Sequence, residues 1–373
     1  MLLELHLIQN FAPSCLNRDD ANAPKDCEFG GTRRARISSQ CIKRSVREEF
    51  KRRIPDQTGS RTKLAVQKLA EKLVELLPAK TADDINKLAK EACEIYFGKT
   101  EKNSDKLSVL VFFDDAELAE LAGKTAEYAS GASANSKKKS ATLESVLKDL
   151  KSKPVAFDIA LFGRMLAEQP GKNIDGACQV AHAISTNRVS MEFDFFTAVD
   201  DLQAAEESGA GMMGTVGFNS SCFYRYSVVQ VEKLLENLRG DKTLLMEALR
   251  EYITASFTAV PTGKQNSFAA HNPPSFAFGV VRKNNMPWSL ANAFEKPVRA
   301  GERMSLTAGS VEALDSYWKT LSRVYRGQAE LAAAASFAVT NDLMASGEAS
   351  AFSEYRQEDL DSFIGRLLSS VEL

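Results

Sequence analysis

Alternating hydrophobic and polar residues predict several strands in this chain. Near the N-terminus, three leucines alternate with Glu4 and His6, which predicts a half-buried strand over residues 2–11. Between residues 188 and 199, polar side chains alternate with valine, methionine and phenylalanine, as expected for another strand. Further strands are predicted at 155–165, 218–229 and about 276–283.

Apolar residues recur every three to four positions over much of the region from 60 to 152, which is typical of amphipathic helices. Pro78 ends the first of these helices, and the hydroxyl of Thr81 is placed to cap the second. The expected elements are helices at 61–77, 81–98, 114–130 and 142–153, with a flexible basic loop at 131–141. Residues 56–153 are therefore predicted to form a helical insertion.

The two strands between residues 188 and 229 predict a long, protruding β-hairpin, because they flank a glycine-rich segment at 200–217. The remaining helices are predicted at about 39–53, 177–186, 230–238 and 242–257, with a polar loop and more helices after the last strand. This order of elements predicts an α+β sandwich with a mainly antiparallel sheet.

The amino-acid composition is typical of a globular protein. The chain has 373 residues, of which 44% are hydrophobic and 26% charged, and its formal net charge is −2. No stretch approaches the roughly 20 apolar residues that a membrane-spanning helix requires. Six scattered cysteines without CxxC spacing argue against a zinc site or a disulfide framework and favour a cytoplasmic location.

Positive charge is concentrated between residues 30 and 53. This stretch has nine basic and two acidic residues, a net charge of +7, and Arg18 and Lys25 precede it. The basic residues are Arg33, Arg34, Arg36, Lys43, Arg44, Arg47, Lys51, Arg52 and Arg53. Such a cluster indicates a phosphate backbone as partner, whereas an isolated basic helix is more often a solvated face.

Helix geometry supports the phosphate interpretation. Ser38 and Ser39 are candidate N-caps, and the free N–H groups of the first turn form an anion site. At about 100° per residue, the residues on one stripe are Gln40, Lys43, Arg44 and Arg47. Ile42, Val46 and Phe50 lie on a neighbouring face, which we expect to be buried.

The segment FAPSCLNRDDANAPKDCEFGGTRRARISSQCIKRSVR, residues 11–47, resembles the N-terminal signature of the CasC family. This family supplies the backbone subunits of Cascade, the type I-E CRISPR surveillance complex. Similar blocks are DIALFGRM (158–165), IDGACQVAHAIST (174–186), DFFTAVDDL (194–202), FNSSCFYRY (218–226), TGKQNSFAAHNP (262–273) and MPWSLANAFEK (286–296). Residues 50–153 and those after about 300 match poorly.

The resemblance implies a modified RRM-like palm from residues 1–55 and 154–373, a helical finger domain at 56–153 and a thumb hairpin at about 188–229. It implies an RNA-binding protein that multimerises along CRISPR RNA and holds this guide for pairing with target DNA in antiviral defence. The implied partners are CRISPR RNA, target DNA through the guide, copies of the chain and the large, small and two guide-end Cascade subunits. No membrane, cofactor or enzymatic activity is expected.

Further RNA-binding residues are expected on the hairpin and in loops. Phe195 and Phe196 face opposite ways on a strand, so at most one packs inward. An exposed role is favoured for Phe196, while Phe195 is as well explained by core packing. The resemblance assigns these two to displacing bases of the guide, and it implies that Thr197 is a thumb residue near the kink and Met165 an apolar wedge at the wrist. The loop candidates for RNA are Lys264, Gln265, Lys296 and Arg299. The run Lys137, Lys138 and Lys139 is typical of a solvated loop, and the resemblance implies that it contacts duplex DNA.

Two other hypotheses stay open. Asp19, Asp20 and Asp26 could hold a divalent ion, as expected for a metal-dependent RNA endonuclease, although Arg18 and Lys25 are available as ion-pair partners. A monomeric RRM-like RNA chaperone is the other alternative. Of the three histidines, His182 is interpreted as a satisfied core residue rather than a metal ligand.

Overall fold

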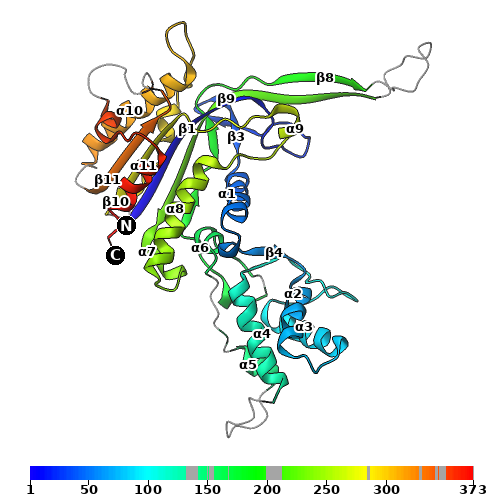
Figure 1. Ribbon diagram of the computed structural model, residues 1–373. Helices are drawn as coiled ribbons and strands as arrows, with labels where there is room; N and C mark the ends of the chain where they lie inside the picture. Colours follow the sequence, from blue (N-terminus) through cyan, green and yellow to red (C-terminus); the bar gives the residue numbers. More distant parts are fainter. Residues whose placement is uncertain are drawn as a thin grey trace, which may run out of the picture. The chain divides into compact units, whose positions relative to one another are not determined.

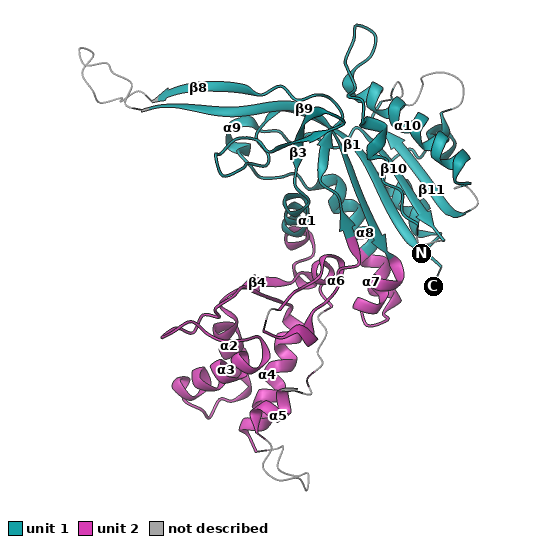
Figure 2. Ribbon diagram, turned by 180° about the vertical axis from the view of Figure 1, so that it is seen from behind, with its two compact units in different colours: residues 1–49, 179–230, 249–373 teal, residues 50–178, 231–248 magenta. Residues whose placement is uncertain are grey.

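The computed structural model describes residues 1–131, 142–148, 150, 155–166, 168–198, 212–283, 286–326, 330–340, 343 and 350–372. It has two compact units, coloured separately in Figure 2. The first comprises residues 1–49, 179–230 and 249–373, and the second comprises residues 50–178 and 231–248. We call them the sheet unit and the helical unit. No helix among the described residues has the length and apolar character needed to cross a membrane.

The sheet unit is built on antiparallel strands in the order β11-β10-β1-β9-β7-β3-β2 (Figure 1). Their bounds are β1 (Leu2–Ser14), β2 (Asp26–Phe29), β3 (Thr32–Ile37), β7 (Ala183–Ser185), β9 (Met212–Gln230), β10 (Phe276–Arg282) and β11 (Leu331–Ala338). Two further strands, β6 (Cys178–Val180) and β8 (Glu192–Ala198), also pair with β9. The predicted α+β fold with an antiparallel sheet is confirmed.

Helices cover both faces of the sheet. Successive side chains of β10 point to opposite faces, and all of them are buried. Phe276 and Phe278 point into a core with Trp318 and Phe352, while Gly279 lies against α11 on the opposite face. The helices of this unit are α1 (Ser39–Arg53), α8 (Lys242–Thr258), α9 (Gln265–Phe268), α10 (Leu306–Val324), α11 (Leu360–Leu368) and the 3-10 turns η5 (Ala291–Phe294) and η8 (Ala351–Tyr355). The first residues of α8 and the last of α1 belong to the helical unit.

The helical unit has its own core of leucine, alanine and aromatic side chains. Its elements are η1 (Pro55–Gln57), β4 (Ser60–Thr62), α2 (Ala65–Leu76), α3 (Ala82–Tyr96), β5 (Val111–Phe113), α4 (Asp115–Ala129), α5 (Leu143–Lys148), α6 (Phe157–Phe162), η3 (Pro170–Lys172) and α7 (Val231–Asn237). Thr81 caps α3 as predicted, and Asp114 caps α4. This unit contains the described part of the predicted insertion at 56–153 and extends beyond it, and the palm, finger and thumb boundaries stay predictions.

The prediction of a half-buried first strand was wrong, because both faces of β1 are buried. Glu4 and His6 are fully buried under α10 and η5. Glu4 forms an ion pair with Arg282 and accepts hydrogen bonds from the Trp288 amide and the Tyr226 hydroxyl. These partners satisfy a carboxylate that would otherwise be unstable in a core.

Two predicted elements have the opposite secondary structure. Residues 155–165 contain the helix α6 instead of a strand, and 177–186 contain β6 and β7 instead of a helix. Five of the six residues of α6 are buried, so its sequence shows no amphipathic period. β7 is held between β3 and β9 by the sheet, a tertiary effect that overrides local propensity.

Other strands lie where the sequence predicted none. The expected basic loop contains the β2–β3 hairpin, whose turn has Gly30 and Gly31 at φ of 59° and 65°. β9 begins at Met212, within the segment predicted as a glycine-rich tip. The C-terminal strand β11, LAAAASFA, is rich in alanine, a helix former that pairing with β10 holds in an extended conformation.

Candidate nucleic-acid interface

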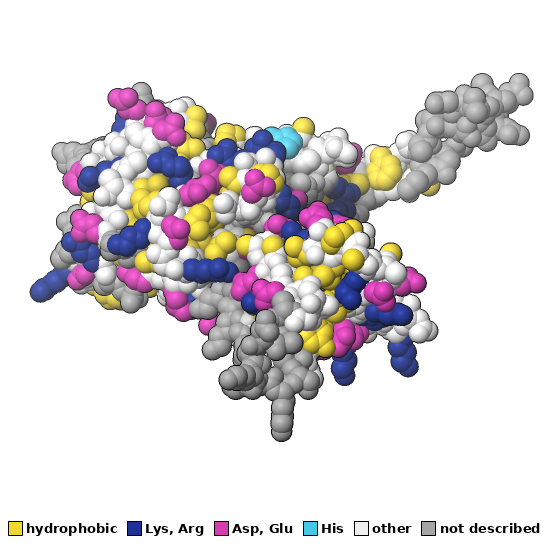
Figure 3. Space-filling model, turned by 60° about the horizontal axis from the view of Figure 1, so that its bottom comes forward, with side chains coloured by type: hydrophobic (Ala, Val, Ile, Leu, Met, Phe, Trp, Pro, Cys, Tyr) yellow, Lys and Arg dark blue, Asp and Glu magenta, His cyan; other side chains and the backbone are white. Residues whose placement is uncertain are grey.

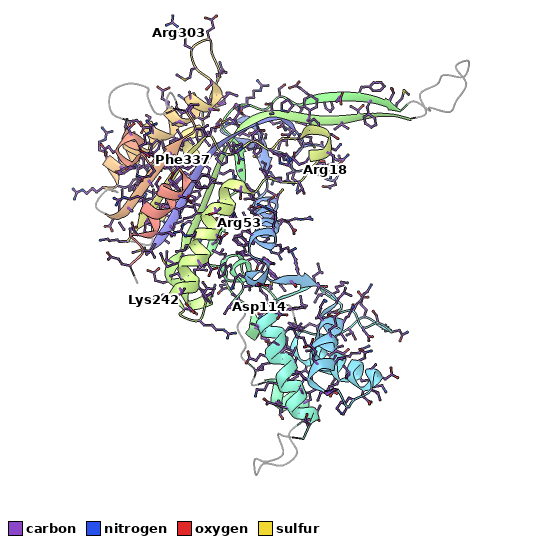
Figure 4. The ribbon with its side chains drawn as sticks, in the orientation of Figure 1. Arg18, Arg53, Asp114, Lys242, Arg303 and Phe337 are labelled. Carbon is purple, nitrogen blue, oxygen red and sulfur yellow. The ribbon has the colours of Figure 1, made fainter. Side chains whose placement is uncertain are left out.

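Three segments far apart in the sequence meet at one groove of the sheet unit. This cavity of about 680 Å³ is bordered by the loop after β1, by α1 and by Thr262 and Gly263 (Figure 4, near the Arg18 label). We call it the α1 groove; its lining residues are Leu16, Asn17, Arg18, Asp19, Asp20, Asn22, Cys41, Arg44, Ser45, Glu48, Thr262 and Gly263. Three of the regions predicted to bind RNA therefore come together.

α1 has the predicted cap and the predicted buried face. The Ser38 hydroxyl accepts a hydrogen bond from the Cys41 amide at 3.3 Å, while the Ser38 amide donates to Asn17 at 2.8 Å. Ile42, Val46 and Phe50 are buried, as predicted. Ser38 is itself buried, so its observed role is to cap the helix, and direct contact with RNA stays a prediction.

The polar stripe of α1 is only partly open to solvent. Gln40 and Arg44 are exposed, and Arg44 lines the groove. Lys43 and Arg47 are half-buried and have interactions within the protein. Arg44 is therefore the cation of this stripe that is best placed to meet a phosphate group.

The loop between β1 and β2 is held by local contacts that differ from the predicted ones. Arg18 donates to the Asn22 side chain at 2.5 Å, and Asp19 accepts from the Ala23 amide at 2.9 Å. Asp26 pairs with Arg33 at 2.7 Å instead of with Arg18 or Lys25, and this hydrogen bond raises the pKa of Arg33. For Asp26 the expected partners were therefore wrong, although the loop does use carboxylates for turns and ion pairs.

The loop before α9 packs tightly on the loop after β1. A Cβ atom on Gly263 would lie 2.3 Å from the Leu16 carbonyl oxygen, so only glycine allows this approach. Lys264 follows at φ of 47°, and both Lys264 and Gln265 are half-buried. The Gln265 amide donates to the carbonyls of Pro261 and Ala270, which closes its own loop. Contact of either residue with RNA stays a prediction.

The lining of the α1 groove carries both signs of charge. Arg18 and Arg44 are its cations, and Asp19, Asp20 and Glu48 are its carboxylates. Among the described residues, no group of three His, Cys, Asp or Glu side chains is arranged to hold a metal ion. The groove can thus offer cations to a nucleic-acid strand only at particular positions, because its surface is not uniformly basic.

The hairpin of β8 and β9 exposes aromatic side chains (Figure 3, hydrophobic side chains on the arm). Phe193 and Phe195, on one face of β8, are 70% and 62% exposed. Phe196, on the other face, lies across Gly214 and is 39% exposed, and Thr197 is exposed. The core alternative for Phe195 was therefore wrong.

Sequence analysis missed Phe193 as a candidate contact. Its side chain continues the apolar alternation of Val189 and Met191, but only Phe195, Phe196 and Thr197 were predicted as contacts on this strand. The exposed face arises because β8 pairs with β9 beyond the strands that the helices cover (Figure 1). The predicted long hairpin was the available signal, since a protruding pair of strands has no second layer to bury its apolar face.

His182 is exposed, so its interpretation as a core residue was wrong. It lies between β6 and β7, where a helix had been predicted. Its Nδ1 accepts a hydrogen bond from the Ser39 amide at 3.2 Å and lies 3.4 Å from an Arg36 nitrogen. Partial burial and the nearby charges of Arg36 and Lys25 lower the pKa of His182. The neutral ring therefore occupies part of the expected anion site at the start of α1.

Arg34 is fully buried and is not part of a surface basic cluster. Its guanidinium donates to the carbonyls of Ser185 and Thr186 at 2.9 Å and to those of Phe294 and Glu295 at 2.7 and 3.1 Å. The expectation that Arg34 adds to the charge facing RNA was wrong. Its role is to bind three separate segments of the sheet unit to one another.

The remaining candidates lie elsewhere. Met165, in the helical unit, is 80% exposed. Lys296 and Arg299 are exposed on the segment after η5, and Arg299 lines a second cavity. Lys25 is half-buried between Asn17 and Arg36, with which its backbone forms hydrogen bonds. The DNA-binding candidates Lys137, Lys138 and Lys139 lie outside the described residues.

The model of one protein family, described as CT1975-like protein, matches residues 3–364. Two solved chains are similar over 100% of this chain and 100% of their own length. One, titled "CRISPR RNA-guided surveillance complex, pre-nicking", has a TM-score of 0.83 and 30% sequence identity. Another, titled "CRISPR RNA-guided surveillance complex", has a TM-score of 0.72 and 27% identity. No curated protein matches the chain.

Proposed function

Because the chain belongs to the family of CT1975-like proteins, we propose that it is a backbone subunit of a CRISPR RNA-guided surveillance complex and binds the guide RNA. The observation that carries this proposal is the structural match to chains of such complexes over the full length. The match includes both compact units, so it extends beyond a sheet shared by many unrelated proteins.

The α1 groove is the site that we assign to the guide backbone. Arg18 and Arg44 enter it from two elements, and Lys264 follows Gly263 at its edge. Guanidinium groups bind phosphate oxygens in pairs, which fixes a strand without reading its sequence. Sequence recognition then belongs to base pairing between guide and target, so the protein needs only charge and shape.

The β8–β9 hairpin is assigned to the bases of the guide. Its exposed Phe193 and Phe195 can stack on bases or separate them, a contact that tolerates any sequence. Met165 offers another exposed apolar side chain, in the helical unit. In this proposal, cationic side chains bind the phosphate backbone of the guide RNA and apolar side chains contact its bases.

The finer assignments belong to the same proposal. We place the chain in a type I-E Cascade, in several copies along one guide, with target DNA bound through the guide. The large, small and two guide-end subunits are its other partners. A cytoplasmic location is supported by six cysteines that are all free thiols.

We propose that the chain has no catalytic activity. Support comes from the loop aspartates, since Asp26 is paired with Arg33 and Asp19 accepts from a backbone amide. Metal-assisted cleavage needs carboxylates that hold the ion and leave a coordination position open beside the scissile phosphate. Carboxylates already used by the loop are poorly suited to that role.

Co-expression with a CRISPR RNA tests the function. We expect the purified protein to carry that RNA protected from nuclease, and electron microscopy to show regular multimers along it. Co-expression with an unrelated RNA of equal length is the control for guide preference. A protein that purifies as an RNA-free monomer in the presence of the CRISPR RNA would contradict the proposal.

A further inference from the structure

Three arginines converge on a second cavity of the sheet unit. This cavity of about 300 Å³ is lined by Gly31, Thr32, Arg33, Arg188, Pro297, Val298 and Arg299. We call it the arginine pocket. It shares no residue with the α1 groove and has no carboxylate among its lining residues. Arg299 was a candidate from sequence, but no pattern joined it to Arg33 and Arg188.

The walls of the arginine pocket are fixed by buried contacts. Arg34 lies beneath them and binds carbonyls of Thr186, Phe294 and Glu295. The Val189 amide donates to the Arg33 carbonyl, and the Val298 amide donates to the Thr186 carbonyl. Each of the three arginines that line the pocket is thus attached to a segment that is held in place before any ligand arrives.

The positive charge of the arginine pocket is largely uncompensated. Within the described part of the chain, the side chains of Arg188 and Arg299 have no hydrogen-bond or ion-pair partner, and both are exposed. Arg33 uses two of its five N–H donors on Asp26. The pocket therefore presents three guanidinium groups, and the carboxylates of Asp26 and Glu28 lie near one of them, Arg33.

We propose that the arginine pocket binds a phosphodiester group of nucleic acid, as a contact separate from the α1 groove. The inference rests on the proposed function, which it extends to a second phosphate position. β3 runs from Thr32 and Arg33, which line the pocket, toward α1, which borders the groove, and its six residues span about 17 Å. A nucleic-acid strand bound in both the arginine pocket and the α1 groove would be held at the two ends of β3.

Phosphate suits this geometry better than a carboxylate does. A planar carboxylate has two oxygens, which one guanidinium satisfies in a bidentate pair. Guanidinium groups from three segments instead match a tetrahedral anion with oxygens that point in several directions. The alternative occupant is the hairpin of a second copy, which exposes Glu192 and Asp194. Charge-reversal variants distinguish that occupant from nucleic acid.

The experiment compares Arg188→Ala combined with Arg299→Ala against Arg303→Ala. Arg303 is an exposed arginine at the outer end of the loop before α10 and does not line the pocket (Figure 4). Binding is measured at several salt concentrations, with guide RNA alone and with guide RNA plus complementary DNA. Circular dichroism verifies that each variant is folded, as expected for exposed side chains.

We expect the double variant to bind more weakly, with a salt slope smaller by about 0.7 for each phosphate group that it no longer neutralises. The Arg303→Ala protein should match wild type. A difference with guide RNA alone assigns the phosphate to the guide, and a difference only after DNA is added assigns it to the target strand. Both results support the pocket as a phosphate site.

Other results overturn the assignment. If wild type binds RNA and the double variant has the same affinity and slope in both arms, the pocket is not a phosphate site and the proposed function stands. If RNA binding is unchanged but multimers disappear with Arg188→Glu and return with Glu192→Arg and Asp194→Arg, a second copy occupies the pocket. If wild type shows no salt-dependent RNA binding, the proposed function fails together with the pocket.

Discussion

α1 exposes Gln40 and Arg44 above a buried apolar face, whereas β8 exposes Phe193 and Phe195 with no layer to cover them. The two elements also differ in charge. Residues 30–53 have a net charge of +7, while residues 190–224 contain six acidic residues and no lysine or arginine. β8 and all but the last four residues of α1 belong to the sheet unit.

We propose that α1 and the hairpin hold a nucleic-acid strand by different kinds of interaction. In the proposed function, the cations of the α1 groove would attract the phosphates of RNA, and this attraction would weaken as salt rises, because counterions are released when phosphates bind. The acidic hairpin gains nothing from phosphates and would repel them. It can contribute only through its exposed aromatic rings, and that contribution should depend little on salt.

Charge reversal in the α1 groove should have the largest effect. We expect Arg18→Glu combined with Arg44→Glu to weaken RNA binding about 100-fold or more, since each charged hydrogen bond contributes about 1.5–3 kcal/mol. Both side chains are exposed, so folding should be unchanged. Titration of labelled guide RNA at two salt concentrations measures the decrease.

Arg303→Glu is the control for that variant, because it reverses a positive charge outside the groove, with half the charge change of the double variant. If it weakens RNA binding as much as the groove variant does, the effect is one of net charge alone. The contrast between α1 and the hairpin would then lose its basis.

Loss of the exposed rings should have the next largest effect. Stacking contributes roughly 1–3 kcal/mol per base, so Phe193→Ala with Phe195→Ala should weaken binding about 10- to 100-fold. The salt slope should stay at the wild-type value. Phe193→Tyr with Phe195→Tyr retains the rings and should restore binding. A reduced salt slope in the alanine variant would show that these residues act through phosphate contacts after all.

Folding stability should depend on pH through His6 in the core of the sheet unit. Burial, with the nearby charge of Arg282, lowers the pKa of His6 to about 3 in the folded protein, against about 6.5 when unfolded. Below pH 6.5 the unfolded chain therefore binds a proton that the folded chain does not. Stability should fall with decreasing pH by about 1 kcal/mol per unit for this group.

Comparison of wild type with His6→Gln isolates the contribution of His6. Burial raises the pKa of Glu4, so Glu4 makes stability fall as pH rises, but this residue is present in both proteins. Urea denaturation at pH 5, 6 and 7 should show a smaller gain of stability with pH in the variant. Equal pH dependence in the two proteins would show that His6 does not stay neutral in the core.

The smallest effect is expected from the loop aspartates. Wild type should leave bound guide and complementary RNA intact with Mg²⁺ or Mn²⁺, and Asp19→Ala, Asp20→Ala and Asp26→Ala should behave alike. The assay is gel electrophoresis of end-labelled RNA over several hours. Regular cleavage by wild type that disappears in one of these variants would establish the endonuclease alternative.

The sequence predicted those parts of the site in which one element carries its own signal. α1 was predictable because its capping serine, buried face and cations recur at helical spacing. The hairpin was predictable from two strands around a glycine-rich segment. The convergence of Arg18, Arg44 and Gly263 on one groove, although suggested by family resemblance, follows physically only from packing between distant segments.

What could not be predicted depends on tertiary contacts. A run of basic residues does not show that Arg34 points inward to four carbonyls while Arg33 points outward. The alanines of β11 favour a helix until β10 pairs with them. The buried Glu4 appears as a polar position of an exposed face until Arg282, 278 residues away, is placed beside it.

We propose that several copies of the chain assemble along one guide RNA. Native mass spectrometry of the protein bound to CRISPR RNAs of increasing length tests it directly. We expect the number of protein copies to rise in regular steps as the guide lengthens. The Arg18→Glu, Arg44→Glu protein should show no such stepwise increase. A single bound copy at every guide length would contradict it and favour a monomeric RNA chaperone.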